Sequence, residues 1–370
     1  VEDIITALSR FKSLFVIARN SSFTYKGRSV DIKQVGRELG VRYVLEGSVR
    51  KASGRIRITG QLIDAGTGAH LWADRFDGSL SDVFELQDQV TTSVVGAIAP
   101  QIDKAEMARV ARKPAENLDA YDYLLRGLAH YHTLTRGSLE EALRLLYLAI
   151  ELDPAFAAPY GLAARCYSTR VDQGWIVDKA REEAEVRRLA SQVAAIGRDD
   201  AFALCWAGHA LVRVCRDNEA GEDLLDRAIA LNPNMALGWR SRAYASLFAG
   251  QHEMAIQQAG RAHRLNPLDP GTGIALLMAS ALLLLGRHDE ALVWAKQSVR
   301  ENPNAVMSLR ALASAHAFLG DLEEARRIGQ EILELDPTLT LSRARAFSAF
   351  RRPEDLSKWI EGIRLAGVPE

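Results

Sequence analysis

Two hydrophobic periods divide the chain. Between residues 41 and 76 apolar and polar side chains alternate, and turns that contain glycine interrupt the alternation near residues 54 and 66. Alternation with a period of two is typical of half-buried strands. From residue 118 onward, apolar side chains instead recur at the spacing of an amphipathic helix. The pattern predicts an α+β chain in which a small α/β part precedes an all-α part.

The first part is interpreted as a sheet with helices packed against it. Asp31 is a suitable N-cap and Gly40 a suitable end for one helix. Residues 1–108 are expected to form this part, with a three- to four-stranded sheet, and residues 109–117 to link it to the next. The expected elements are a strand at 14–18, a helix at 31–39, strands near 41–49, 56–62 and 71–76, and a helix from about Ser81 to Met107.

A four-residue segment that ends in proline recurs at intervals along the second part of the chain. From Pro233 onward, its prolines are 34, 36 and 34 positions apart. Each follows a helical stretch with small residues at fixed offsets, and a glycine turn precedes several of these stretches. Small residues let two helices approach closely, and proline prevents the second helix from continuing. The prolines are Pro154, Pro233, Pro267, Pro303 and Pro337.

This pattern resembles the tetratricopeptide repeat, a helix–turn–helix unit that stacks into a superhelix. The resemblance covers residues 118–337 and implies about six repeats, that is, an all-α solenoid. Residues 338–370 are expected to form a capping helix, because terminal repeats need a polar outer face. The best match consists of Trp239, Ala255, Ala262 and Pro267.

Three segments of the first part resemble a TolB-like amino-terminal domain, a small α/β module often placed before such repeats in bacterial regulators. The usual first strand of that module is absent, as if the module were cut at Val1. We therefore expect the chain to be the later part of a longer protein. The segments are Leu45–Arg50, Arg57–Asp64 and His70–Phe76.

Phe15–Gly27 and Gly96–Pro100 extend the resemblance to bacterial class III adenylate or guanylate cyclases that carry a catalytic domain, this module and then repeats. The likeness is to their non-catalytic region, because the paired metal-binding aspartates of the catalytic domain would lie before Val1. It implies a protein–protein interaction and regulatory region in cyclic AMP signalling that is not itself an enzyme. Two alternatives stay open: the sensor region of a winged-helix transcriptional regulator, and a free-standing tetratricopeptide scaffold.

Composition narrows the class of protein further. Lys and Arg number 46 and Asp and Glu 47, and this net charge of −1 excludes a globally basic nucleic-acid binder. Three cysteines in 370 residues cannot build a disulfide framework and fit a reducing compartment. The longest apolar run, Ile274–Leu285, is shorter than the roughly 20 residues that a membrane span needs. We expect a cytoplasmic chain with no membrane segment and no nucleic-acid partner.

The sequence contains no recognisable constellation of catalytic, metal-binding or cofactor-binding residues. Asp64, Asp74 and Asp77 lie on or beside strand ends without a metal-ligand pattern, so solvated positions are expected for them. His130 and His132 are two positions apart, which points their rings to opposite sides of a helix. We expect no catalytic residue, no metal and no cofactor in this chain.

Four basic residues gather at one expected hairpin. They are candidates for binding a phosphate, a nucleic acid or an acidic surface of an upstream domain. Aromatic residues are sparse among them, so a solvated hairpin face is the favoured interpretation. The residues are Arg50, Lys51, Arg55 and Arg57.

Tetratricopeptide arrays bind partners on a concave face that the first helix of each repeat lines. Arginine together with aromatic side chains on that face suits an extended peptide or its carboxylates. The same helix faces also pack between repeats, which is the competing interpretation. We expect a protein or peptide partner, with self-association or an upstream catalytic domain as alternatives. The candidate groove residues are Tyr131, His209, Arg213, Arg240, Tyr244 and Arg310.

Overall fold

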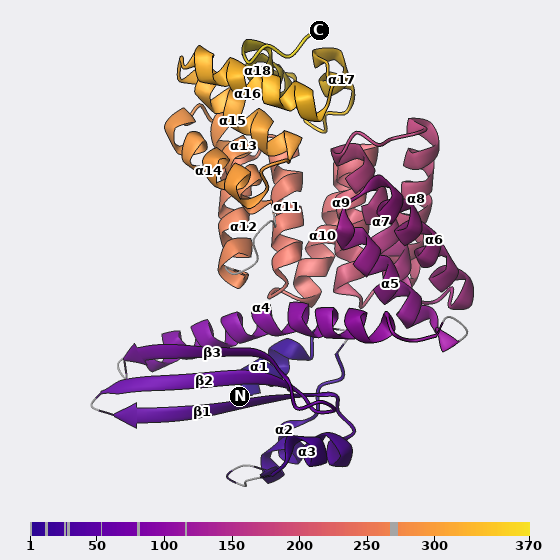
Figure 1. The fold of residues 1–370 in the computed structure, drawn as a ribbon, viewed down its shortest axis with the longest axis vertical. Helices are drawn as coiled ribbons and strands as arrows, with labels where there is room; N and C mark the ends of the chain where they lie inside the picture. Colours follow the sequence, from indigo (N-terminus) through magenta and orange to yellow (C-terminus); the bar gives the residue numbers. More distant parts are fainter. Residues whose placement is uncertain are drawn as a thin grey trace. The chain divides into compact units, whose positions relative to one another are not determined.

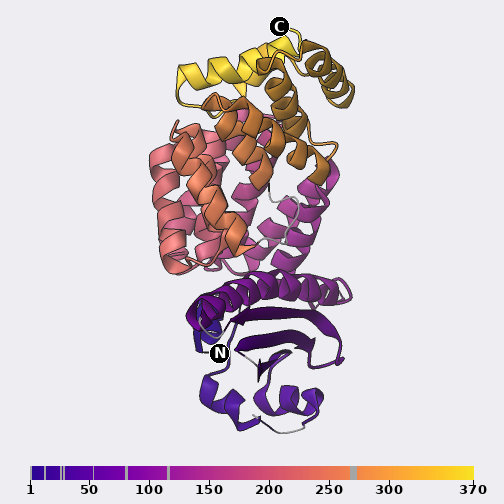
Figure 2. The ribbon, with the colours of Figure 1, turned by 90° about the vertical axis from the view of Figure 1, so that its left-hand side faces the viewer.

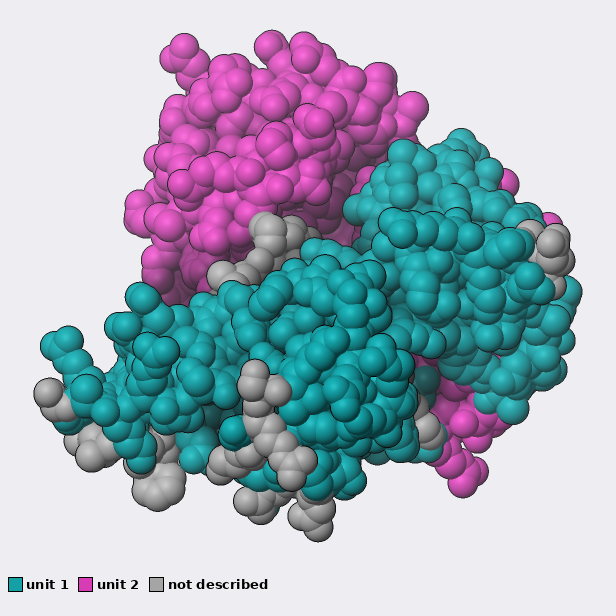
Figure 3. Space-filling view, turned by 60° about the horizontal axis from the view of Figure 1, so that its bottom comes forward, with its two compact units in different colours: residues 1–156, 199–201, 231–234 teal, residues 157–198, 202–230, 235–370 magenta. Residues whose placement is uncertain are grey.

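The structure is a computed structural model, and the chain forms two compact units, which Figure 3 distinguishes by colour. The first unit comprises residues 1–156, 199–201 and 231–234, and the second comprises residues 157–198, 202–230 and 235–370. The residues that the structure describes are 2–11, 14–25, 27, 30–52, 54–79, 82–114, 117–266 and 273–370.

The first unit contains an antiparallel meander of β1 (Tyr43–Ala52), β2 (Arg55–Asp64) and β3 (His70–Ser79), as Figure 1 shows. In its register Val49 of β1 lies opposite Ile58 of β2, and Ile58 lies opposite Phe76 of β3. Directly opposed residues share a face, so this register collects the apolar residues on one side of the sheet.

A long helix, α4 (Val83–Val110), runs along the sheet and packs against β3 (Figure 1). Its apolar stripe, which includes Leu86 and Val94, is buried. The strands make room for it with glycine, because a Cβ atom on Gly78 would lie 2.7 Å from Leu86 Cδ2. The predicted start of this helix, Ser81, lies outside the described residues.

Short helices precede the sheet: α1 (Glu2–Leu8), α2 (Arg19–Ser22), the 3₁₀ helix η1 (Phe23–Tyr25) and α3 (Ile32–Leu39). As predicted, the Asp31 side chain caps α3 by accepting from the Lys33 N–H, and Gly40 ends it in the left-handed conformation. The predicted strand at 14–18 is wrong, because these residues are irregular and the Phe15 side chain is 90% exposed. An apolar run forms a strand only where a neighbouring strand pairs with it.

Six helix pairs follow within the described part of the chain. The first pair belongs to the first unit, and the other five make up most of the second unit. Pro267, a predicted repeat end, lies outside the described residues. The pairs are α5 (Ala120–Thr133) with α6 (Arg136–Leu152), α7 (Ala157–Asp172) with α8 (Lys179–Ile196), α9 (Ala201–Cys215) with α10 (Asn218–Leu231), α11 (Ala236–Phe248) with α12 (His252–Leu265), α13 (Ile274–Leu284) with α14 (His288–Glu301), and α15 (Val306–Phe318) with α16 (Leu322–Leu335).

The first helices of the pairs in the second unit, α7, α9, α11, α13 and α15, lie against one another. A Cβ atom on Gly161 of α7 would lie 2.7 Å from Ala203 Cα of α9, so the two backbones nearly touch. Cys205 Sγ of α9 lies 3.4 Å from Ser241 Oγ of α11. Packing contacts continue from α11 to α13 and from α13 to α15. We call these five helices the inner helices.

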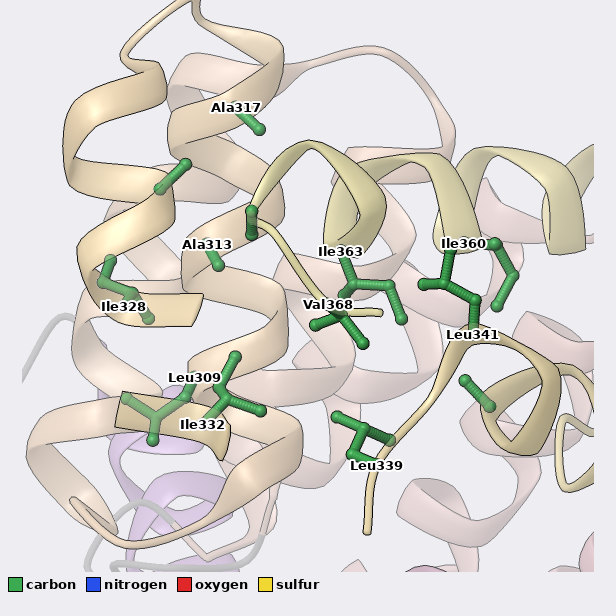
Figure 4. Close-up of a cluster of buried hydrophobic side chains, with 13 residues drawn as sticks. Leu309, Ala313, Ala317, Ile328, Ile332, Leu339, Leu341, Ile360, Ile363 and Val368 are labelled. Atoms are coloured by element: carbon green, nitrogen blue, oxygen red, sulfur yellow. The ribbon is translucent and has the colours of Figure 1, made fainter. Parts of the chain in front are cut away.

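The chain ends in two helices, α17 (Leu341–Ala346) and α18 (Pro353–Leu365), where the sequence predicted one capping helix over 338–370. Figure 2 shows α18, in yellow, beside the orange helices of the last pairs. Both helices belong to one hydrophobic core, because Leu341 of α17 and Ile360 and Ile363 of α18 lie in the same buried cluster as Leu309 and Ile328 (Figure 4). The C-terminal segment is therefore an integral part of the second unit.

Candidate functional site

The inner helices bring together most of the predicted groove residues. The rings of His209 on α9 and Tyr244 on α11 meet edge to face, with centroids 5.9 Å apart. The Tyr244 hydroxyl donates a hydrogen bond of 3.1 Å to the Gly273 carbonyl. His209 is only 6% exposed, so its imidazole is packed between the inner helices, in a surface that we call the wall of the array.

This part of the wall carries a positive field. Burial lowers the pKa of His209 well below its usual range, and the charges of Arg165, Arg240 and Arg213 lower it further. Burial also raises the pKa of Tyr244 to about 12. Near neutral pH the imidazole and the phenol are therefore uncharged, and the charges that act on them are those of the three arginines and of Asp172. We call Arg165, His209, Arg213, Arg240 and Tyr244 the basic cluster.

Arg213 of the basic cluster is held by two hydrogen bonds. Its Nε donates to Asp172 Oδ1 at 2.7 Å, and its Nη1 donates to the Phe347 carbonyl at 3.0 Å. Its side chain is 11% exposed. A single carboxylate, that of Asp172, thus forms an ion pair with it inside the second unit.

Arg310 on α15 is buried to the same degree but is bound differently. Its guanidinium carbon lies 5.6 Å from the centroid of the Trp359 ring, and its Nε has no hydrogen-bond partner among the described residues. Burial lowers its pKa to about 10, and the charge of Arg213 adds to the effect, while Asp336 opposes it. The field of Arg310 therefore adds to that of the basic cluster.

Tyr131 lies on α5 in the first unit. Its ring there packs against His132, with centroids 5.6 Å apart. The sequence interpretation also missed Arg165. Arg165, His209 and Tyr244 are each the ninth residue of their inner helix, so comparing equivalent repeat positions would have found it.

The predicted basic hairpin is split between the two faces of the sheet. Arg50 and Arg57 are opposed in register and share a face, whereas Lys51 points to the other face. Arg57 Nε donates to Asp77 Oδ1 at 2.6 Å, and this hydrogen bond lowers the pKa of Asp77. The hairpin therefore carries its own counter-charge at an exposed surface.

Sequence reasoning missed a buried carboxylate in the first unit. Glu106 on α4 is 4% exposed, and its Oε1 accepts hydrogen bonds of 2.7 Å from both Arg42 Nη1 and the Tyr43 hydroxyl. Its Oε2 accepts from Arg109 Nε at 3.0 Å. Burial alone would raise the pKa of Glu106, but these hydrogen bonds outweigh burial and lower it. We call these four residues the Glu106 network; it fastens the start of β1 to α4.

Asp103, one turn before Glu106, provides a test by pH. Burial, and then the charge of Glu106, raises the pKa of Asp103 from 3.8 to about 6. The folded protein thus holds this proton more tightly than the unfolded chain does. The stability from this group is fully present below about pH 4 and is lost as the pH rises through about 6.

We therefore expect Asp103→Asn to stabilise the first unit at neutral pH by about 1–3 kcal/mol. At about pH 3 the variant and the parent chain should be nearly equally stable, since the carboxyl group is mostly protonated in both the folded and the unfolded chain there. Urea unfolding of both proteins between these pH values measures the difference. A difference that does not grow with pH would contradict the assignment.

The described residues offer little for other chemistry. No group of three or more His, Cys, Asp or Glu side chains among them could hold a metal ion. His132 is exposed and His130 half-buried, on different sides of α5. Burial raises the pKa of Cys166 to about 12, which keeps this thiol protonated and unreactive. No helix in the described ranges is long and apolar enough to cross a membrane.

Comparison with known proteins gives partial matches. No family model matches the chain. It is 50% identical over 159 residues to a Rhizobium meliloti protein named "Putative adenylate cyclase 3", a match that covers 43% of this chain and 27% of that protein. It is 28% identical over 167 residues to the transcriptional regulator HilA of Salmonella typhimurium, covering 44% of this chain and 29% of HilA. The matches therefore span less than a third of the length of these curated relatives.

Similar solved structures are helical arrays of low sequence identity. The Cut9–Hcn1 hetero-tetramer of the APC/C matches with a TM-score of 0.50 and 15% identity, covering 70% of this chain and 47% of that chain. The tetratricopeptide protein TTC0263 of Thermus thermophilus matches with a TM-score of 0.40 and 23% identity, covering 53% of this chain and 98% of that chain. The six helix pairs form tetratricopeptide-like repeats, and the chain also contains a small antiparallel sheet.

Proposed function

We propose that this chain is a protein–protein interaction and regulatory region, and that the basic cluster on its inner helices binds an acidic segment of a partner. The observation that carries the proposal is the field around His209, where three arginines crowd a neutral, buried ring. A guanidinium group recognises a carboxylate with two parallel hydrogen bonds. An acidic segment of a partner offers carboxylates for such contacts.

The neighbourhood of the cluster supports an acidic partner. Asp172 forms an ion pair with Arg213, and Asp336 is the acidic group that acts on Arg310. The buried Trp359 ring packs against the Arg310 guanidinium group. Charged groups at a solvent-excluding wall attract ligands more strongly than exposed ones, because screening by water is weaker there.

We propose further that the chain belongs to a bacterial adenylate cyclase in cyclic AMP signalling and acts in the cytoplasm. The identity to the Rhizobium meliloti protein supports this assignment. In this proposal residues 1–108 are the TolB-like module, 118–337 the tetratricopeptide repeats and 338–370 the C-terminal cap, and the catalytic activity belongs to another part of the protein. The chain itself should produce no cyclic AMP from ATP, a measurement that would overturn the proposal if product appeared.

A second candidate is the sensor region of a transcriptional regulator. The identity to HilA favours it. The two candidates differ in what accompanies the chain, so the coding sequence around it distinguishes them. A cyclase domain supports the first candidate, and a DNA-binding domain supports the second.

Binding of a defined acidic probe tests the basic cluster. We expect hexaglutamate to bind the chain in low salt and hexaglutamine not to bind, as measured by isothermal titration calorimetry. Arg240→Ala should weaken hexaglutamate binding by about tenfold, since a charge-assisted hydrogen bond contributes about 1.5–3 kcal/mol. The affinity should fall as salt is added.

Arg242→Ala is the matched control on the same helix. Arg242 instead pairs with Glu222 and Asp226, at N···O distances of 3.0 and 2.8 Å. Its loss should leave hexaglutamate binding unchanged. Equal losses of affinity in the two variants would show that binding follows the overall charge, and the basic cluster would then not be the site.

A further inference from the structure

The C-terminal segment Arg343–Trp359 contacts the C-terminal ends of the inner helices α7, α9, α11 and α13 one after another. At α7, Arg343 Nη2 donates to the Gly174 carbonyl at 2.9 Å. At α9 the direction is reversed, because Arg213 Nη1 donates to the Phe347 carbonyl at 3.0 Å. Arg216, just beyond the end of α9, likewise donates to a carbonyl of the segment, at 2.7 Å.

The series continues along the next two helices. At the end of α11, the Arg351 N–H donates to the Phe248 carbonyl at 2.9 Å. At the end of α13, Lys358 Nζ donates to the Leu284 carbonyl at 2.9 Å. Each of four successive inner helices therefore receives a polar contact from the segment, in the order of the chain.

An aromatic side chain completes the contact. The Phe350 ring lies between Phe248 of α11 and Trp359 of α18, at centroid distances of 5.6 and 5.8 Å. The Phe248 ring in turn lies 6.0 Å from that of Tyr244 in the basic cluster. The segment thus combines main-chain, cationic and aromatic contacts along one edge of the inner helices.

Physical chemistry explains why these helix ends attract such a segment. The last carbonyl groups of a helix have no partner inside the helix, and the helix dipole makes them negative. Cations and main-chain N–H groups are their natural partners. A further contact joins Arg352 Nη1 to the Gly250 carbonyl at 3.3 Å. We define the rim as the carbonyl groups of Gly174, Phe248, Gly250 and Leu284 together with the guanidinium groups of Arg213 and Arg216.

We infer that the rim is a second interaction surface, built for an extended segment with basic and aromatic residues, and that Arg343–Trp359 fills it in this chain as an internal ligand. A partner of the same pattern binds by replacing the connector between α17 and α18. Arg351 and Arg352 in that connector are exposed, whereas Trp359 and Ile360 are buried. The connector is therefore the part that a partner displaces, and α18 remains anchored.

A peptide with the sequence of residues 343–359 tests this inference when it is added to the whole chain. Phe350→Ala combined with Arg352→Ala removes two connector contacts, the ring on Phe248 and the hydrogen bond to the Gly250 carbonyl, and leaves the rim itself unchanged. We expect the labelled peptide to bind this double variant at least about tenfold more tightly than the parent chain, because a tethered segment competes at an effective concentration near millimolar. Fluorescence anisotropy measures the affinity.

Matched variants separate the rim from general charge effects. Arg364→Ala removes a cation of α18 that pairs with Glu361 instead of the rim, so it should leave peptide binding at the parental level. Adding Arg216→Ala to the double variant should reverse the gain in affinity. Equal peptide affinity in the double variant and the parent chain, or equal binding of a scrambled peptide, would overturn the inference.

Hydrogen exchange of the parent chain gives a test that needs no variant. The Arg351 amide is bonded to the rim, so it should exchange slowly in the free chain. A saturating concentration of the peptide should speed its exchange by displacing it. Unchanged exchange at saturation would contradict displacement.

The rim and the basic cluster are tested by different probes. Hexaglutamate addresses the basic cluster, whereas the peptide of residues 343–359 carries the cations that the rim carbonyls accept. If the chain binds the peptide but not hexaglutamate, the inference about the rim stands and the acidic-partner proposal is refuted. The reverse result would refute the rim alone.

Discussion

Replacing Trp359 with alanine is expected to lower the free energy of unfolding of the second unit by about 3–5 kcal/mol. The ring is 4% exposed and packs among Ala279, Leu282 and Ala315 of α13 and α15. Its removal leaves a cavity and also deprives the buried Arg310 guanidinium of its aromatic neighbour. Urea unfolding followed by circular dichroism measures the loss.

Trp359→Phe is the matched control for this prediction. Phenylalanine keeps a ring in the same place and should cost well under half as much as alanine. Hydrogen exchange of the Ala variant should show the α18 segment opening before the rest of the unit. A loss below about 1 kcal/mol for Trp359→Ala would mean that α18 does not hold the C-terminal segment.

The second large effect lies in the first unit. Glu106→Ala is expected to destabilise that unit by about 1–3 kcal/mol, because it removes the buried acceptor that three hydrogen bonds share, while the Arg42 and Arg109 side chains, 61% and 38% exposed, can turn to water. The guanidinium groups of Arg42 and Arg109 and the Tyr43 hydroxyl would lose the acceptor they share. Glu106→Gln keeps an acceptor but not the charge, so its loss should be intermediate.

Glu85→Ala serves as a control on the same helix. The Glu85 side chain is exposed, and such surface replacements usually change stability by less than about 0.5 kcal/mol. Urea unfolding of the three variants ranks the effects. A Glu106→Ala variant as stable as Glu85→Ala would show that the Glu106 network does not fasten β1 to α4.

The local part of the fold could be predicted from the sequence. The cap at Asp31 and the glycine at Gly40 bound α3, because both act within one helical turn. The helix pairs follow from the spacing of small residues and prolines, since each pair is built from one short stretch of chain. The alternating pattern likewise predicted the meander of β1, β2 and β3.

Contacts between distant residues could not be predicted in this way. Arg343 and Gly174 are 169 positions apart, and no periodic pattern connects them. The Glu106 network joins residues 64 positions apart. From the sequence of α4 alone, the Glu106 carboxylate would be expected to lie in solvent. The predicted strand at 14–18 failed for the same reason, because a strand depends on a partner elsewhere in the chain.

The candidate site was found in part. His209, Arg213, Arg240 and Tyr244 come together because they occupy similar positions on neighbouring inner helices, which repeat spacing identifies. What spacing does not tell is that the C-terminal segment returns to these helices. The Phe347 carbonyl, which Arg213 binds, belongs to a segment that the sequence assigned to a simple cap.

The most direct measurement of the central claim is a nuclear magnetic resonance titration of the histidines with hexaglutamate. The chain has eight histidines, and His209 lies inside the basic cluster. We expect the ring signals of His209 to shift and its pKa to rise, because bound carboxylates offset the arginine charges. The signals of the exposed His132 should stay in place. Unchanged His209 signals at saturating hexaglutamate, or an equal shift in Arg240→Ala, would contradict the claim that the basic cluster binds acidic partners.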